Sequence, residues 1–107
     1  MWNHAIHLEA YFGVPCAGGV VLTLNLRLLP DDLTYISNHA KPRLLIVDDV
    51  LLPLAKQIRH AFERIVVVNW NGKPDLATTD YEAFIAEAPK DMSFPPIAET
   101  DAAGMCY

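Results

Sequence analysis

The sequence predicts an α/β protein with a Rossmann-like parallel sheet and flanking helices. Three observations lead to this class. Short β-branched runs recur along the 107 residues, segments with helical periodicity separate them, and glycine or proline lies at several boundaries. Strands that alternate with helices are joined by right-handed crossovers, which make the strands parallel. We therefore expect a single, incomplete α/β unit over residues 1–107.

The first predicted helix ends before Gly18 and Gly19, which can terminate it. The apolar run at residues 20–24 follows as a strand that we expect to be buried on both faces. The helix assignment rests on apolar residues that recur on one helical face: Leu8, Tyr11, Phe12, Pro15 and Cys16.

A second helix is predicted to begin at Pro30, with Asp31 and Asp32 near the positive end of its dipole. It should end before Pro42, because a residue that precedes proline is pushed out of the helical region. The second strand is then 43–48. The predicted buried face of the helix consists of Leu33, Ile36 and Ala40.

The third helix has the clearest periodicity and leads into a third strand at residues 65–68. Its apolar face is formed by Leu51, Leu54, Ala55, Ile58 and Phe62. Residues 69–75 have the Asn-Gly and Lys-Pro pairs of a surface loop.

A short fourth helix is predicted from Thr79 and Glu82, which have the spacing of a capping box. Residues 89–100 contain three prolines and should cross irregularly to a last strand within 101–107. The side chains expected to be buried by the fourth helix are Tyr81, Phe84, Ile85 and Ala88.

Composition narrows the class of protein. The net charge of -5 and the absence of a Lys/Arg cluster argue against nucleic acid and anionic membranes as partners. No apolar run reaches the ~20 residues of a membrane span, and no secretory leader is recognisable. Cys16 and Cys106 form no CxxC pair, so we expect both to be thiols in a cytoplasmic protein.

The four histidines are weak candidates for a metal-binding or catalytic site. His4 and His7 lie one turn apart and could share a metal, but the sequence places no third ligand, and solvated or capping roles compete. His39 and His60 lie near predicted helix C-termini, where an imidazolium interacts well with the dipole.

Asp48 and Asp49 form the best local site candidate, at the carboxyl end of a predicted parallel strand. The segment 43–49 is also similar to the opening of a response-regulator receiver domain, whose acidic pair binds Mg²⁺. Too few residues follow Asp49 for the remaining β/α repeats of that fold. Capping of the next helix by either aspartate is the structural alternative.

A series of short motifs resembles the adenylate-forming (AMP-binding) acyl-CoA synthetases, most closely the medium- and long-chain fatty acid CoA ligase branch. The terminal run has the form Asp-x-Ala-x-x-x-Tyr, which in that family leads into a phosphate-binding loop. Leu26 departs from the family pattern, which has proline there. The motifs, in order, are Trp2-Asn3, residues 7–12, 15–18 and 23–25, Arg27-Leu28, Tyr35-Ile36, and residues 38–40, 45–48 and 101–107.

The resemblance implies part of the N-terminal domain of an ATP-dependent ligase that forms an acyl-adenylate and then an acyl-CoA. ATP, Mg²⁺, coenzyme A and a fatty acid are implied for the full-length family. Because the phosphate loop would begin just after Tyr107, no residue here is expected to be catalytic, cofactor-binding or metal-binding. Tyr107 is expected to position the loop, and the other residues to serve as scaffold.

Some expectations concern individual residues and the behaviour of the isolated chain. Cys106 is expected to be a small apolar residue of a buried strand, and Arg27 to anchor a turn or lie free at the surface. We expect the chain to associate with itself or with the rest of a synthetase through exposed apolar faces. The alternatives are the receiver-like module with Asp48 and Asp49, and a non-catalytic interaction domain that retains the ligase scaffold.

Overall fold

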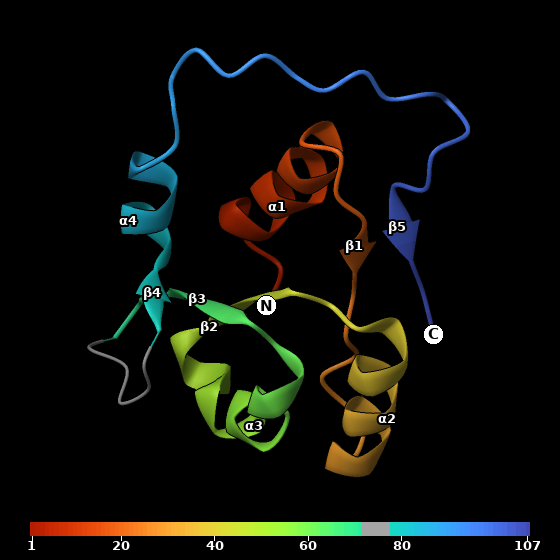
Figure 1. Ribbon diagram of the computed structural model, residues 1–107. Helices are drawn as coiled ribbons and strands as arrows, with labels where there is room; N and C mark the ends of the chain where they lie inside the picture. Colours follow the sequence, from red (N-terminus) through yellow and green to blue (C-terminus); the bar gives the residue numbers. More distant parts are fainter. Residues whose placement is uncertain (72–77) are drawn as a thin grey trace. The chain divides into compact units, whose positions relative to one another are not determined.

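The computed structural model describes residues 1–71 and 78–107, which form two units (Figure 1). The first unit comprises Met1 and Asn25–Ala88, and the second comprises Trp2–Leu24 and Pro89–Tyr107. Each unit contains one small parallel sheet, with several helices beside it in the first unit and α1 alone in the second. The α/β class and the parallel pairing are therefore as the sequence predicts.

The sheet of the first unit has the order β2-β3-β4. Strands β2 (Leu44–Asp48) and β3 (Arg64–Val68) pair in parallel along their whole length, with Leu44 opposite Arg64. The short β4 (Thr79–Asp80) joins the other side of β3, with Val66 opposite Thr79. The two longer strands confirm the predicted runs within one residue.

The core of the first unit is built around β3. Its β-branched side chains suit a pleated strand that is covered on both faces, and the run from Ile65 to Val68 is buried. Val66 and Val67 are fully inaccessible to solvent. The other buried apolar residues of the described chain also belong to this unit: Leu33, Ile36, Val47, Leu52, Ala55, Ile58, Phe62 and Tyr81.

Helix α2 (Pro30–Ala40) confirms the predicted second helix. Pro30 occupies the first turn together with Asp31 and Asp32, and the helix ends where Lys41 adopts a left-handed conformation at φ 52°. Leu33 and Ile36 face the core as expected, whereas Ala40 is only half-buried.

The third helix is broken, which corrects the prediction of one continuous helix. A 3₁₀ turn at Asp49–Leu51 precedes α3 (Leu52–Gln57), and a second turn follows at Arg59–Ala61. Ile58 leaves helical geometry at φ -110°, and Phe62 is already extended. Because β3 begins only two residues later, the backbone has to leave the helix early, which also turns Phe62 into the core. Leu51 and Leu54 remain half-buried.

Helix α4 (Tyr81–Ala86) is capped by Asp80, which corrects the predicted capping box at Thr79. Thr79 lies in β4, and its hydroxyl oxygen instead accepts a hydrogen bond from Arg64 Nε at 3.1 Å. Tyr81 is buried and Phe84 half-buried, but Ile85 and Ala88 are exposed, contrary to expectation. The predicted loop at residues 69–75 lies partly outside the described residues.

The second unit consists of α1 (Ala5–Cys16) and the parallel pair β1 (Val21–Leu22) and β5 (Gly104–Met105). After α1 the chain reverses through Gly18 at φ 81°, a conformation that favours glycine. The prediction that β1 is buried on both faces is wrong: its two residues are half-buried, because β5 is their only strand partner in the described chain.

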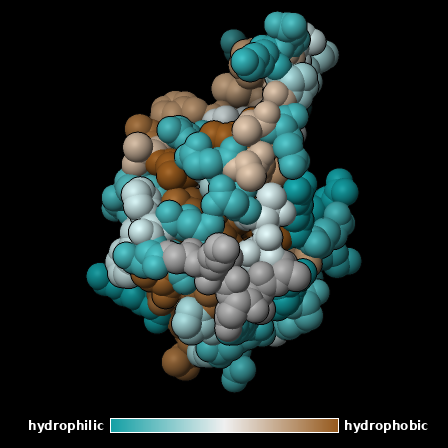
Figure 2. Space-filling model, turned by 90° about the vertical axis from the view of Figure 1, so that its left-hand side faces the viewer, coloured by the Kyte–Doolittle hydropathy of each residue, from teal (hydrophilic) through white to brown (hydrophobic). Residues whose placement is uncertain are grey.

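Residues 89–100 contain no helix or strand, as their prolines predict. Among the described residues no helix combines the length and the apolar character needed to cross a bilayer. Figure 2 shows hydrophobic side chains reaching the surface between hydrophilic ones on one face of the molecule.

Candidate functional site

The carboxyl ends of β2 and β3 bring Asp48 and Trp70 together. Asp48 is the last residue of β2 and is only 1% exposed. Its Oδ1 accepts a hydrogen bond from the indole Nε1 of Trp70, which lies two residues after β3, at 3.3 Å. A buried carboxylate requires such a donor, since an unpaired charge in the core is costly. Asp48 therefore forms part of the structure of this edge, and it makes no side-chain cap for the following turn.

Asp49 ties the end of β2 to the loop after β3. One carboxylate oxygen accepts from the backbone N–H of Val50 at 2.7 Å. The other accepts from two backbone N–H groups of the neighbouring loop, those of Trp70 at 2.9 Å and Asn71 at 2.7 Å. Three donors from two segments thus hold one carboxylate, which ties residues 70 and 71 to the end of β2.

Asp80, the last residue of β4, lies at the same edge of the sheet. Its Oδ2 accepts a short hydrogen bond from the Asn69 side-chain amide, and its Oδ1 caps α4 by accepting from the Ala83 backbone N–H at 3.1 Å. Both bonds favour the ionised form, so the pKa of Asp80 is lowered, chiefly by Asn69. The carboxylate is therefore held charged at the start of a helix.

The described side chains of this strand-end edge are engaged with the protein itself. Within residues 1–71 and 78–107, no three His, Cys, Asp or Glu side chains gather where they could hold a metal ion. The Asp49 oxygens already accept backbone hydrogen bonds, and Asp48 is buried against Trp70. Their contacts hold residues 69–71 and the start of α4 at the end of the sheet.

The histidine pair at the start of α1 has a structural role. His4 is the N-cap, and its Nδ1 accepts from the backbone N–H of His7 at 3.3 Å, which confirms the capping interpretation. The His7 Nδ1 donates to the Trp2 carbonyl oxygen at 3.0 Å. The two ring centroids lie 6.3 Å apart, and the described residues bring no third metal ligand to them.

The remaining candidate residues are dispersed. His39 lies in the last turn of α2, as predicted, and stacks on Tyr35 with ring centroids 5.9 Å apart. His60 lies exposed in the turn at Arg59–Ala61. In the connection after β1, the backbone N–H of Arg27 donates to Asn25 Oδ1 at 3.0 Å, so Asn25 supplies the side-chain contact of that turn.

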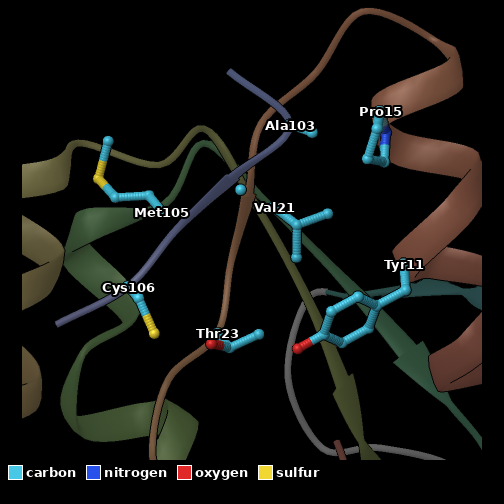
Figure 3. Close-up of a pocket in the computed structure, with 8 residues that line it drawn as sticks. Tyr11, Pro15, Val21, Thr23, Ala103, Met105 and Cys106 are labelled. Atoms are coloured by element: carbon cyan, nitrogen blue, oxygen red, sulfur yellow. The ribbon is translucent and has the colours of Figure 1, made fainter.

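An open apolar groove lies in the second unit, where α1 faces the β1–β5 pair (Figure 3). Its volume is about 340 Å³, and Figure 3 shows the Tyr11 ring and Thr23 at the same end of it. The lining residues are Tyr11, Pro15, Val21, Thr23, Ala103, Gly104, Met105 and Cys106.

Cys106 lines this groove and is exposed, so the expectation that it packs inside a buried strand is wrong. The strand pair has too little cover within this chain to bury it. Cys16 is also exposed, and both cysteines are thiols, as predicted. Tyr107, two residues beyond β5, is 53% exposed.

Sequence reasoning found Asp48 and Asp49 but missed three of their neighbours at the strand-end edge. Trp70 and Asn69 directly follow β3, and Asp80 ends β4. Their position is the available signal, because the carboxyl ends of parallel strands lie at one edge of a sheet. Applied to the third strand as well as the second, that rule would have singled out Asn69 and Trp70.

Comparison with known proteins gives a consistent result along the whole chain. The family of AMP-binding enzymes matches residues 1–107. A 3-methylmercaptopropionyl-CoA ligase from Ruegeria pomeroyi is 37% identical over 99% of this chain and 21% of its own length. A long-chain fatty acid CoA ligase from Thermus thermophilus is 38% identical over 99% of this chain and 19% of its own length.

Solved structures give the same picture. The crystal structure of the anthranilate CoA ligase AuaEII in complex with anthranoyl-AMP superposes with a TM-score of 0.83 and 25% identity. The superposition covers 95% of this chain and 20% of that structure. The chain thus spans about a fifth of the length of the relatives that it matches.

Proposed function

The chain belongs to the AMP-binding enzyme family, and on this premise we propose that it is a scaffold segment of an ATP-dependent acyl-CoA ligase. The observation that carries the proposal is the match of 99% of the chain to curated CoA ligases at 37% and 38% identity. The whole ligase would join a carboxylic acid to ATP, releasing pyrophosphate, and then transfer the acyl group from AMP to the thiol of coenzyme A.

The residues described here contribute support to that reaction. The buried β3 strand and the hydrogen bonds of Asp49 fix where the chain leaves the sheet, which is where open α/β folds place their ligands. In this proposal ATP, Mg²⁺ and coenzyme A are bound by other parts of the ligase. Tyr107 would help to position the phosphate-binding loop of the whole ligase.

The proposed acid substrate is a fatty acid of medium or long chain. Two features support this choice. The Thr23-Leu24-Asn25 and Asn38-His39-Ala40 segments resemble that branch, and the Thermus thermophilus relative is a long-chain ligase. The proposed location is the cytoplasm, where ATP and coenzyme A are available. The proposed partner is the rest of the synthetase, with self-association when the chain is alone.

A chimaeric enzyme tests this function directly. The segment of the Thermus thermophilus ligase that aligns with this chain would be replaced by residues 1–107, and acyl-CoA formation from ATP, coenzyme A and a long-chain fatty acid would be measured. We expect soluble and active enzyme, because in this proposal the parts that bind ATP, Mg²⁺ and coenzyme A all come from the parent ligase. The matched control is the same ligase with the segment deleted.

Two results would contradict the proposal. An insoluble chimaera would show that the chain cannot serve as the scaffold of a ligase. A soluble but inactive chimaera would favour the alternative of a non-catalytic interaction domain. The isolated chain should show no ATP–pyrophosphate exchange with a fatty acid, and a clear exchange signal would overturn the assignment of a purely structural role.

A further inference from the structure

Helix α1 has the composition of a buried helix but is not buried. Among its 12 residues Glu9 and His7 are the only titratable side chains apart from Tyr11 and Cys16, and apolar residues lie on every side. A helix that is apolar all round normally lies inside a protein. Yet no residue of α1 is buried, and Leu8 and Phe12, one turn apart, are 61% and 67% exposed.

Helix α2 differs from α1 in having buried apolar residues. There the apolar Leu33 and Ile36 are buried, while Asp31 and Asp32 are exposed to solvent. The buried apolar residues of α2 are therefore covered by other parts of the chain itself. In α1 the positions of Leu8 and Phe12 remain in contact with water, at a cost that a functional contact would relieve.

The groove adds a second apolar surface next to this helix. Tyr11 and Pro15 of α1 line it together with Val21 of β1 and Met105 of β5. Both residues of β5 are exposed. Parallel strands are normally covered by helices on both faces, so the β1–β5 pair has less cover than its type requires. We define the docking face as Leu8 and Phe12 together with this groove.

We infer that the docking face is covered by the remaining polypeptide of the ligase, through a segment that presents apolar side chains to the groove and to α1. This inference rests on the proposed function. The occupant follows from the comparisons: the chain matches 19% to 21% of two ligases, so about four-fifths of such a polypeptide lies outside it. Family similarity extends over residues 1–107, including the docking face itself.

The test compares one double substitution in two contexts. Leu8→Asp with Phe12→Asp would be made in the isolated chain and in the chimaera that carries residues 1–107. In the isolated chain both side chains are exposed, so the thermal midpoint should change little. In the chimaera the charges would enter an apolar contact, and we expect the midpoint to fall by more than about 5 °C, or soluble enzyme to be lost.

The matched control is Tyr35→Asp, which places a charge at an equally exposed position of α2. This control should change the thermal midpoint of the chimaera no more than an ordinary surface substitution does. A second measurement uses Phe12→Cys in a Cys16→Ala, Cys106→Ala background. A thiol reagent should label it rapidly in the isolated chain and slowly in the folded chimaera.

Several outcomes would overturn the inference. If the double substitution is harmless in both contexts and Phe12→Cys labels equally fast, the face is not covered by the ligase. If it destabilises both contexts equally, the face belongs to the chain's own core. A dimer of the isolated chain that the double substitution dissociates, with an insensitive chimaera, assigns the face to a second copy. In each case an active chimaera leaves the proposed function standing.

Discussion

Asp49 Oδ2 accepts a hydrogen bond from the backbone N–H of Trp70 at 2.9 Å and thereby connects the end of β2 to the end of β3. The same oxygen also accepts from the Asn71 N–H at 2.7 Å. A carboxylate that serves several backbone donors cannot be replaced by a neutral side chain of similar size without loss. This contact therefore gives the first prediction.

Replacing Asp49 by Ala should lower the free energy of unfolding by about 0.5–1.5 kcal/mol, because the exposed Trp70 and Asn71 N–H groups exchange their carboxylate acceptor for water. Urea denaturation followed by tryptophan fluorescence measures this. Asp91→Ala is the control, since Asp91 is an exposed carboxylate in the segment without helix or strand. Equal midpoints for the two variants would show that the Asp49 contacts contribute nothing.

Asp80 should make stability depend on pH. The pKa of Asp80 is lower in the folded protein than in the unfolded chain. Its contribution to stability is therefore fully present above the pKa of the unfolded chain. That contribution is lost as the pH falls through the pKa of the folded protein. An ordinary aspartate titrates near pH 4, so the loss falls below about pH 4. Asn at this position still caps a helix but cannot titrate. The difference in urea midpoint between wild type and Asp80→Asn should therefore shrink from pH 7 to pH 3, and a constant difference would contradict this.

Leu33 and Leu29 should respond very differently to truncation. Leu33 is 1% exposed, and Leu33→Ala should cost about 2–5 kcal/mol, enough to unfold a small unit. Leu29 is the N-cap of the same helix and is 70% exposed, so Leu29→Ala should be nearly neutral. Thermal unfolding followed by circular dichroism distinguishes the two. Similar midpoints would mean that α2 does not pack as described.

Mg²⁺ and a small phosphodonor should leave the chain unchanged. Asp48 is buried against Trp70 and the Asp49 oxygens accept backbone hydrogen bonds, so neither carboxylate is arranged for a metal ion. We expect no shift of the thermal midpoint with Mg²⁺ and no incorporation of phosphate from acetyl phosphate. Stoichiometric phosphorylation that Asp48→Asn abolishes would instead revive the receiver-like alternative.

Local sequence rules identified much of the first unit. The β-branched run at β3 and the proline and aspartates at the start of α2 are local signals, and the structure follows them. The break at Ile58 was not predictable from periodicity, because it depends on how soon β3 begins after the helix. The cap at Asp80 was missed because Thr79 is used by the strand and by Arg64.

The candidate site was predictable only in part. Asp48 and Asp49 could be found from their place at a strand end, but their partners come from a loop more than 20 residues away. Hydrogen bonds of that kind depend on which strands are neighbours in the sheet. The exposure of Cys106 and of the apolar side chains of α1 likewise depends on what covers them, which periodicity does not reveal.

The confinement of the buried core to one unit has a consequence for hydrogen exchange. Every buried apolar residue of the described chain lies between Leu33 and Tyr81, so cooperative opening of β3 requires loss of most of that core. The amides of α1 are held mainly by the helix itself, which is only 12 residues long. In the isolated chain α1 should therefore exchange its amide protons through local fraying, long before β3 does.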